Sequence, residues 1–416
     1  MIAIILFMVP ACWAQLPQAG DTTSPPTPGV GHDYIHAPAE TVNPANGSVS
    51  VRIPVRIAAG RELMVPFNFA YDSSGAFYYG LPPGGVGQPA LRATTGVPFS
   101  QGGWSYTLPM MTYNTETWTV NPSGNKNLLC TEAINYVFQD PTGNRHNMGL
   151  ATIDTAVSWG QYCGGTGPGI FQGGEGPILA TIPAYRNPVT VTDGNGTVYM
   201  FPATQQAPAT SITDRNGNTI SVSSTSSSAT ITDTTDRTAI SVPTFGSNPD
   251  NISVAGLASP AYKVSWTTAS ARFNISVFDL PGSGSCTTSQ SGSASVVSQI
   301  VLPNGQKYAF TYDPTYGMLS KLTYPSGGYV RYVWGLNSQA EAGEWPQGST
   351  GFFDCRYDFP AVTDRYVSFD GTTEVLHQHF SYSTSWPSGS DEYTSKTTTV
   401  TTYDLVRGTN FNTVYT

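Results

Sequence analysis

A strand–turn–strand unit recurs through the middle of the chain and constrains its fold more than any other feature of the sequence. The clearest copies centre on Asp193, Asp214 and Asp233, which are 21 and 19 residues apart. In each copy, β-branched residues flank a turn built from residues that accept positive φ or bond their own backbone. Single hairpins are marginally stable in water, so such units must stack side by side and bury one continuous face. The pattern predicts an array of β-hairpins.

The composition of the chain agrees with strands and disfavours helices. Charged residues make up 11% of the chain, against about a quarter in an ordinary globular domain. The aromatic share is 12%, and the aromatic residues alternate with Thr, Ser and Val, as is typical of strands. Gly and Pro, at 43 and 32 residues, interrupt every stretch long enough for a long amphipathic helix. We therefore expect an all-β fold.

The formal net charge is −9, and the sequence has no run of Lys or Arg. Nucleic acids and anionic membrane surfaces attract clustered positive charge, which this chain lacks. We expect no nucleic-acid partner and no membrane insertion once the export signal is removed.

The first residues are typical of an export signal. Residues 2–9 are apolar, Pro10 ends this run, and Cys12 and Ala14 place small residues at positions −3 and −1 of a cleavage site. We predict a signal peptide at residues 1–14 and a secreted or cell-surface protein. An uncleaved anchor is the alternative, although the apolar run is shorter than the ~20 residues that span a bilayer.

The remaining chain divides into four segments by composition. Residues 15–40 are rich in Pro, Gly, Ser and Thr, a composition that predicts a flexible spacer. Residues 41–185 contain short aromatic strands and are expected to form an N-terminal, β-sandwich-like domain. Residues 186–300 carry the hairpin repeats, and residues 301–416 carry a further set of repeats.

Four cysteines remain after removal of the signal, and an even number in an exported chain can form disulfides. Three pairings are possible, and proximity in the sequence favours Cys130 with Cys163 and Cys286 with Cys355. Free buried thiols are the alternative. The spacing is not that of a zinc or redox motif.

A more specific pattern follows residue 300. A strand ends at Tyr312 and Asp313, a turn at Gly317 follows, and the order Leu-x-x-Leu-x-x-Pro-x-Gly runs from Leu319 to Gly327. This order resembles the tyrosine–aspartate (YD) repeat of the Rhs family.

Further segments are similar to what precedes these repeats in secreted Rhs-type proteins, and a second, partial repeat follows. The preceding segments are residues 46–54, 140–146 and 212–218, and the partial repeat spans residues 362–382. Together with the first repeat, they extend the resemblance over most of residues 43–416.

The resemblance implies a β-sheet shell that encloses a C-terminal toxin or effector. We therefore expect a non-enzymatic scaffold that is the N-terminal part of a longer protein. Its partner would be the missing effector or the surface of a target cell, which it would contact through a glycan. Its structural turn residues would be Asp193, Asp214, Asn216, Gly217, Asp313, Gly317 and Gly327.

The sequence contains no motif that predicts catalysis or a cofactor. A serine-hydrolase elbow and a nucleotide-binding loop are both missing. His377 and His379, two apart on a strand, would face one side and supply two ligands for zinc or iron. No nearby acidic pattern completes this set, so we interpret them as surface or pocket histidines and predict no metal site.

A calcium site has a slightly better case. The segment from Asp214 to Asn218 matches the first ligand positions of an EF-hand loop, but Thr219 and Thr225 replace the required Gly and Glu. We interpret the segment as a plain turn.

Two other functions stay open. A cell-surface adhesin or carbohydrate-binding protein would use exposed rings among Trp104, Trp118, Trp159, Trp266, Trp334, Trp345 and Trp386. A secreted glycoside hydrolase would need two carboxylates, with candidates Glu132, Asp140, Glu341 and Glu344.

Overall fold

The computed structural model describes most of the chain beyond the expected signal and spacer. It covers residues 39–58, 60–80, 90–93, 97–120, 128–141, 143, 145–153, 163, 171–274, 277–279, 289–347, 351–390 and 392–416. The predicted signal peptide at 1–14, and the predicted spacer except for its last two residues, lie outside these ranges. In the described part the only helix is the 3-10 turn η1 (Ser73–Gly75), and the rest of the regular structure is strand, so the all-β prediction is confirmed. No helix among these residues is long and apolar enough to cross a membrane.

Most strands belong to one sheet of 19 strands, in which neighbours in space are almost always neighbours in sequence. Every pair with a described register is antiparallel, as a stack of hairpins requires. One exception to the chain order is β23, which pairs with β28. The strands are β12 (Phe171–Glu175), β13 (Ile178–Ile182), β14 (Val189–Thr192), β15 (Val198–Phe201), β17 (Ser211–Thr213), β18 (Thr219–Ser224), β19 (Ala229–Thr232), β20 (Thr238–Val242), β21 (Asp250–Val254), β22 (Tyr262–Asn274), β23 (Val277–Asp279), β24 (Ser289–Val301), β25 (Lys307–Tyr312), β26 (Leu319–Thr323), β27 (Tyr329–Gln347), β28 (Gly351–Ser368), β29 (Glu374–Ser385), β30 (Ser395–Asp404) and β31 (Thr409–Tyr415).

Three smaller sheets are built mainly from strands that precede it in the chain. The N-terminal sheet has the order β1-β2-β3-β7-β6 and comprises β1 (Glu40–Val42), β2 (Val49–Pro54), β3 (Asn68–Asp72), β6 (Ser100–Gln101) and β7 (Trp104–Tyr106). A second five-stranded sheet comprises β8 (Met110–Val120), β9 (Leu128–Gln139), β10 (Arg145–Asn147), β11 (Thr152–Ile153) and β16 (Gln206–Pro208). The third is the pair β4 (Phe77–Gly80) and β5 (Ala90–Ala93).

The sheets do not follow the segment boundaries expected from composition. The large sheet begins at β12, before residue 185, and runs past residue 300 without interruption. Strand β16, from the repeat region, pairs with β8 of the N-terminal segment. The segments are thus joined by backbone hydrogen bonds as well as by side-chain packing.

The three repeat turns adopt one hydrogen-bonding pattern. In each turn the first carboxylate oxygen of Asp193, Asp214 or Asp233 accepts the backbone N–H groups two and four residues later, at 2.8 to 3.2 Å. The third residue after each aspartate has positive φ, and it is Gly196, Gly217 or Asp236. Aspartate tolerates this conformation better than most residues.

The other predicted turn residues also lie in turns. Asp313 accepts the N–H groups of Thr315 and Tyr316, both at 2.8 Å. Gly317 and Gly327 have φ of 69° and 93°, a region that favours glycine.

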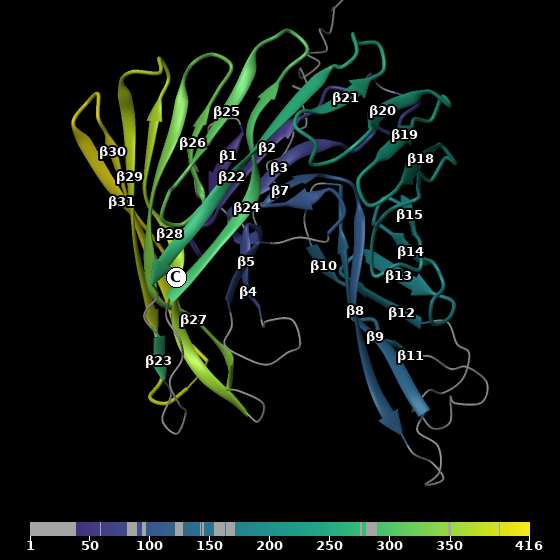
Figure 1. Cartoon of the computed structure of the whole chain (residues 1–416), viewed down its shortest axis with the longest axis horizontal. Coiled ribbons are helices and arrows are strands. Elements are labelled where there is room, and N and C mark those ends of the chain that lie inside the picture. The colour runs from purple at the N-terminus through teal and green to yellow at the C-terminus, as the bar shows by residue number, and fades with distance from the viewer. Residues whose placement is uncertain are drawn as a thin grey trace, which may run out of the picture.

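The N-terminal sheet packs within the bend of the large sheet (Figure 1). Aromatic side chains fill the space between the two sheets. Trp104 contacts Phe310 with ring centroids 4.6 Å apart, and Tyr106 contacts Phe245 at 4.9 Å. The sandwich-like packing expected for residues 41–185 is therefore made largely between the N-terminal sheet and the repeats.

A buried ion pair connects the first strand of the N-terminal sheet to the C-terminal part of the large sheet. Glu40 on β1 and Arg365 on β28 are 1% and 2% exposed, and the guanidinium binds the carboxylate through two nitrogens. The Tyr332 hydroxyl donates to the same carboxylate at 2.6 Å. Gln378 accepts a further hydrogen bond from Arg365 at 2.9 Å. These four side chains satisfy two charges that would be costly to bury alone.

A disulfide joins Cys130 on β9 to Cys163, the pairing that proximity favours, with 5.6 Å between the Cα atoms. Cys286 and the side chain of Cys355 lie outside the described part of the chain.

The ion pair yields a first prediction. Replacing Glu40 with Ala leaves the Arg365 charge buried and unpaired, which typically costs about 3–5 kcal/mol. We expect the free energy of unfolding, measured by urea titration, to fall by that amount. Lys396→Ala is the control, because Lys396 and its partner Glu341 are partly exposed and such pairs contribute below about 1 kcal/mol. Equal losses in both variants would contradict the prediction.

The third repeat turn yields a second prediction. Burial of Asp233 raises its pKa, but hydrogen bonds from Thr235 and Arg237 outweigh this effect and lower the pKa to about 2. The charged form therefore stabilises the fold above pH ~4, and this contribution is lost as the pH falls toward 2. Asp233→Asn should cost about 1–2 kcal/mol at pH 7, a range that allows for screening of the partly exposed Arg237.

Urea unfolding at pH 7 and at pH 3 measures this effect. The difference between Asp233→Asn and the unmodified protein should shrink at the lower pH. Asp214→Asn is the comparison variant. The hydrogen bond from the Asn218 amide also lowers the pKa of Asp214, but this carboxylate has no guanidinium partner, so its loss should shrink less at the lower pH. A loss for Asp233→Asn that is independent of pH would contradict the assignment.

Candidate functional site

Two histidines and an aspartate converge on the face of the large sheet that points away from the N-terminal sheet. On β29, alternation sends His377 and His379 to this outer face and Gln378 to the inner face, where it binds Arg365. The register pairs Asp364 of β28 with His379. Arg365 points inward to Glu40, so its neighbour Asp364 points outward.

The three side chains share one carboxylate oxygen. His377 Nε2 lies 2.8 Å and His379 Nδ1 lies 2.9 Å from Asp364 Oδ1. One donor atom of each side chain lies within 4.8 Å of the other two. Burial raises the pKa of Asp364, but the hydrogen bonds with His377 and His379 have the larger combined effect, so this pKa lies below its ordinary value.

A cross-strand stack holds the His377 ring in place. The ring lies between those of Tyr366 and Tyr403, with centroids 4.3 and 5.0 Å away and planes inclined by 1° and 14°. The Arg331 guanidinium covers the other face of Tyr366 at 3.8 Å. Glu374 binds Arg331 through two hydrogen bonds of 2.9 and 3.0 Å, so this cation has a counter-charge. The imidazole is therefore oriented by its neighbours.

The sequence reasoning found the two histidines and missed Asp364, which precedes His377 by 13 residues. No short motif joins these positions, because the carboxylate comes from the adjacent strand. A signal was available in the turn at Asp370 and Gly371. A hairpin centred there places residues 364 and 379 opposite each other, as the register has them.

The other histidine of the described part has a different arrangement. His146 Nε2 lies 3.3 Å from Asp140, while Nδ1 lies 3.7 Å from Glu175. The two carboxylates approach different ring nitrogens, which point away from each other, so the three groups do not converge on one point. His32 and His36 lie outside the described residues.

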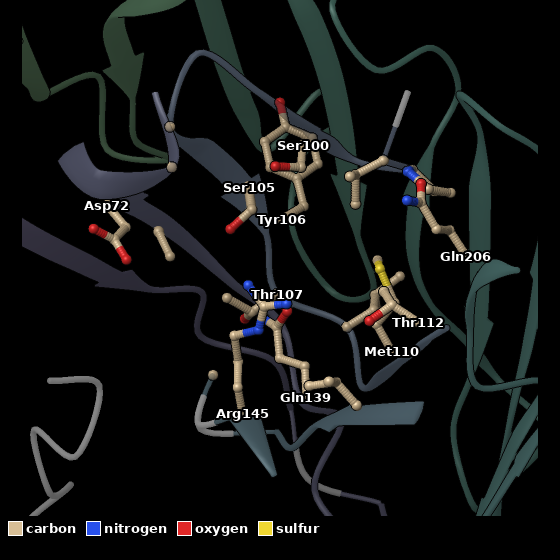
Figure 2. A pocket seen from close by; sticks show the side chains of 18 of the residues that line it. Asp72, Ser100, Ser105, Tyr106, Thr107, Met110, Thr112, Gln139, Arg145 and Gln206 are labelled. Carbon is tan, nitrogen blue, oxygen red and sulfur yellow. The ribbon is translucent and has the colours of Figure 1, made fainter. Parts of the chain in front are cut away.

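A cleft of about 340 Å³ opens between β3 and β7 of the N-terminal sheet and the sheet of β8, β9 and β10. Figure 2 shows polar side chains from both sheets around it. They include Asp72, Ser105, Thr112, Gln139, Arg145 and Gln206. The volume falls in the range of small-molecule sites.

The tryptophans have mainly structural positions. Trp104, Trp266 and Trp334 are buried, and their indole N–H groups donate to Tyr312, Asp250 and the carbonyl of Leu319.

Two other tryptophans are half-buried. Trp386 donates to the Gln339 carbonyl at 2.9 Å, and Arg356 stacks on its ring. Trp118 lies on β8. Trp159 and the side chain of Trp345 lie outside the described part.

Among the candidate hydrolase carboxylates, Glu132 and Asp140 lie too far apart for an acid pair. Glu132 lies in the middle of β9, and Asp140 lies just past its end. About 25 Å of strand therefore separates the two residues. Glycosidase carboxyls lie within about 10 Å of each other. Glu341 binds Lys396 at 2.8 Å, and the side chain of Glu344 is outside the described residues.

Asp214 is used as a turn residue. Its oxygens accept N–H groups of Asn216 and Asn218, which is the plain turn expected from the sequence.

No family model matches the chain, and no curated protein matches it. The Rhs resemblance therefore stays a prediction that depends on the motifs quoted above.

Proposed function

We propose that the chain is a non-enzymatic, exported scaffold whose large sheet is part of the wall of a shell that holds a C-terminal effector. The observation that carries this proposal is the large sheet itself. Its strands follow one another almost in chain order from β12 to β31. Such a sheet lengthens with each added hairpin and bends as it grows, as a wall requires.

Strand β31 leaves one edge of the large sheet open. β31 pairs with β30, and no described strand pairs with its other edge. Natural proteins usually protect such edges with Lys, Pro or a bulge. The segment from Thr409 to Tyr415 contains no Lys and no Pro, and Phe411 and Val414 are 59% and 57% exposed. Such an edge is open to pairing with a further strand.

The N-terminal sheet supports the same role. It lies within the bend of the large sheet (Figure 1) and is attached there by buried polar contacts as well as by aromatic packing. Such contacts favour one fixed curvature over a range of shapes, and a container needs a fixed curvature.

Limited proteolysis of the protein expressed from its complete reading frame tests the proposal. We expect any segment encoded after Thr416 to resist a protease in the intact protein. The same segment expressed alone is the control and should be cleaved rapidly, as mass spectrometry of the fragments would show. A reading frame that stops after Thr416, or equal cleavage of the segment in both settings, would rule out the shell.

A carbohydrate-binding role is the second candidate, and the cleft in Figure 2 is the observation that favours it. Its lining combines the ring of Tyr113 with the amides of Gln139 and Gln206 and the charged groups of Asp72 and Arg145. Sugars are bound by such combinations of rings and hydrogen-bonding groups.

A glycan array, followed by titration of any glycan that binds, tests this second role. Gln139→Ala should weaken binding about tenfold through loss of a hydrogen bond. Gln306→Ala, in the exposed turn after β24, is the matched control and should bind normally. Absence of any glycan signal at high protein concentration would exclude the role.

A further inference from the structure

We propose that Asp364, His377 and His379 form a Zn²⁺ site on the outer face of the large sheet. The donor set of two imidazole nitrogens and one carboxylate oxygen is one that zinc binds well. This proposal is independent of the shell, because it depends only on side chains of the neighbouring strands β27 to β30.

Two of the three donor–donor distances need only small adjustments to accept the ion, and the third, between the two histidines, lies within 4.8 Å. Zinc bonds of about 2.0–2.2 Å at tetrahedral angles place donor atoms about 3.4 Å apart. The two histidine nitrogens lie 2.8 and 2.9 Å from Asp364 Oδ1, so each would move outward by a few tenths of an ångström. His379 is 45% exposed, which leaves room for a water molecule as the fourth ligand.

The surrounding residues fix the ligands before any ion binds. Tyr366 and Tyr403 hold the His377 ring from both sides. Directly behind the site, Arg365 and Gln378 connect β28 and β29 through a hydrogen bond of 2.9 Å on the inner face. Sites with ligands oriented in this way bind metals more tightly than sites on mobile side chains.

The local charge also permits a cation. Asp364 supplies a carboxylate directly to the ion. The nearest cation of the stack, Arg331, lies beyond Tyr366 and is paired with Glu374. A bound Zn²⁺ would therefore meet the Asp364 carboxylate and the two imidazole nitrogens.

The consequence for the protein is a link between two strands. Asp364 belongs to β28, and His377 and His379 belong to β29. An ion bound to all three would hold these strands together and stabilise the folded state in proportion to its occupancy. The bound water would leave one coordination position open to an external ligand.

Calorimetric titration of the metal-free full chain with ZnCl₂ tests the site. We expect one Zn²⁺ to bind per chain with micromolar affinity or better, and to raise the melting temperature. Co²⁺ should give the visible absorption of a four-coordinate site. Asp364→Asn and His379→Ala should each weaken Zn²⁺ binding by about 100-fold or more.

His146→Ala is the matched control, because it removes a histidine that also contacts two carboxylates. It should bind Zn²⁺ like the unmodified protein. Melting curves without metal verify that the variants are folded. The proposal is overturned if Zn²⁺ does not bind, or if folded Asp364→Asn and His379→Ala bind it as tightly as the unmodified chain; the triad would then be a hydrogen-bonded cluster only.

Discussion

A hairpin array buries only one face of its sheet, so the apolar inner face of the large sheet needs a cover, which the N-terminal sheet supplies together with β9 of the neighbouring sheet. Most of the architecture depends on this contact. Rings such as Trp104 and Phe310 fill the space between the sheets. Because both faces of this interface are buried, the polar groups inside it must bind one another, as Glu40, Tyr332 and Arg365 do.

The same contact determines which side chains are available for function. Alternation along β28 and β29 sends Arg365 and Gln378 inward to the interface and leaves Asp364, His377 and His379 on the outside. A slip of one residue in this register would exchange the two sets and bury the histidines. The buried ion pair therefore also holds the register of the candidate metal site on the opposite face.

Much of the fold could be predicted because its signals are local. The turns at Asp193, Asp214 and Asp233 form within five residues, and their carboxylates satisfy N–H groups of the same turn. The two outward histidines were also predictable, since alternation on a strand is local. Asp364 was not, because it reaches them through pairing of two strands. The tie between Glu40 and Arg365 joins residues 325 positions apart and leaves no pattern in the sequence.

The sequence by itself determined the all-β class, the hairpin turns and the alternation of faces along each strand, because each follows from the conformational preferences of neighbouring residues. Only the tertiary structure decided that the repeats form one sheet of 19 strands around the N-terminal sheet, and which carboxylate meets the paired histidines. The arrangement of the sheets and the meeting of these side chains depend on which apolar surfaces bury one another. Hydrophobic burial is nondirectional, so strand composition alone does not specify its partners.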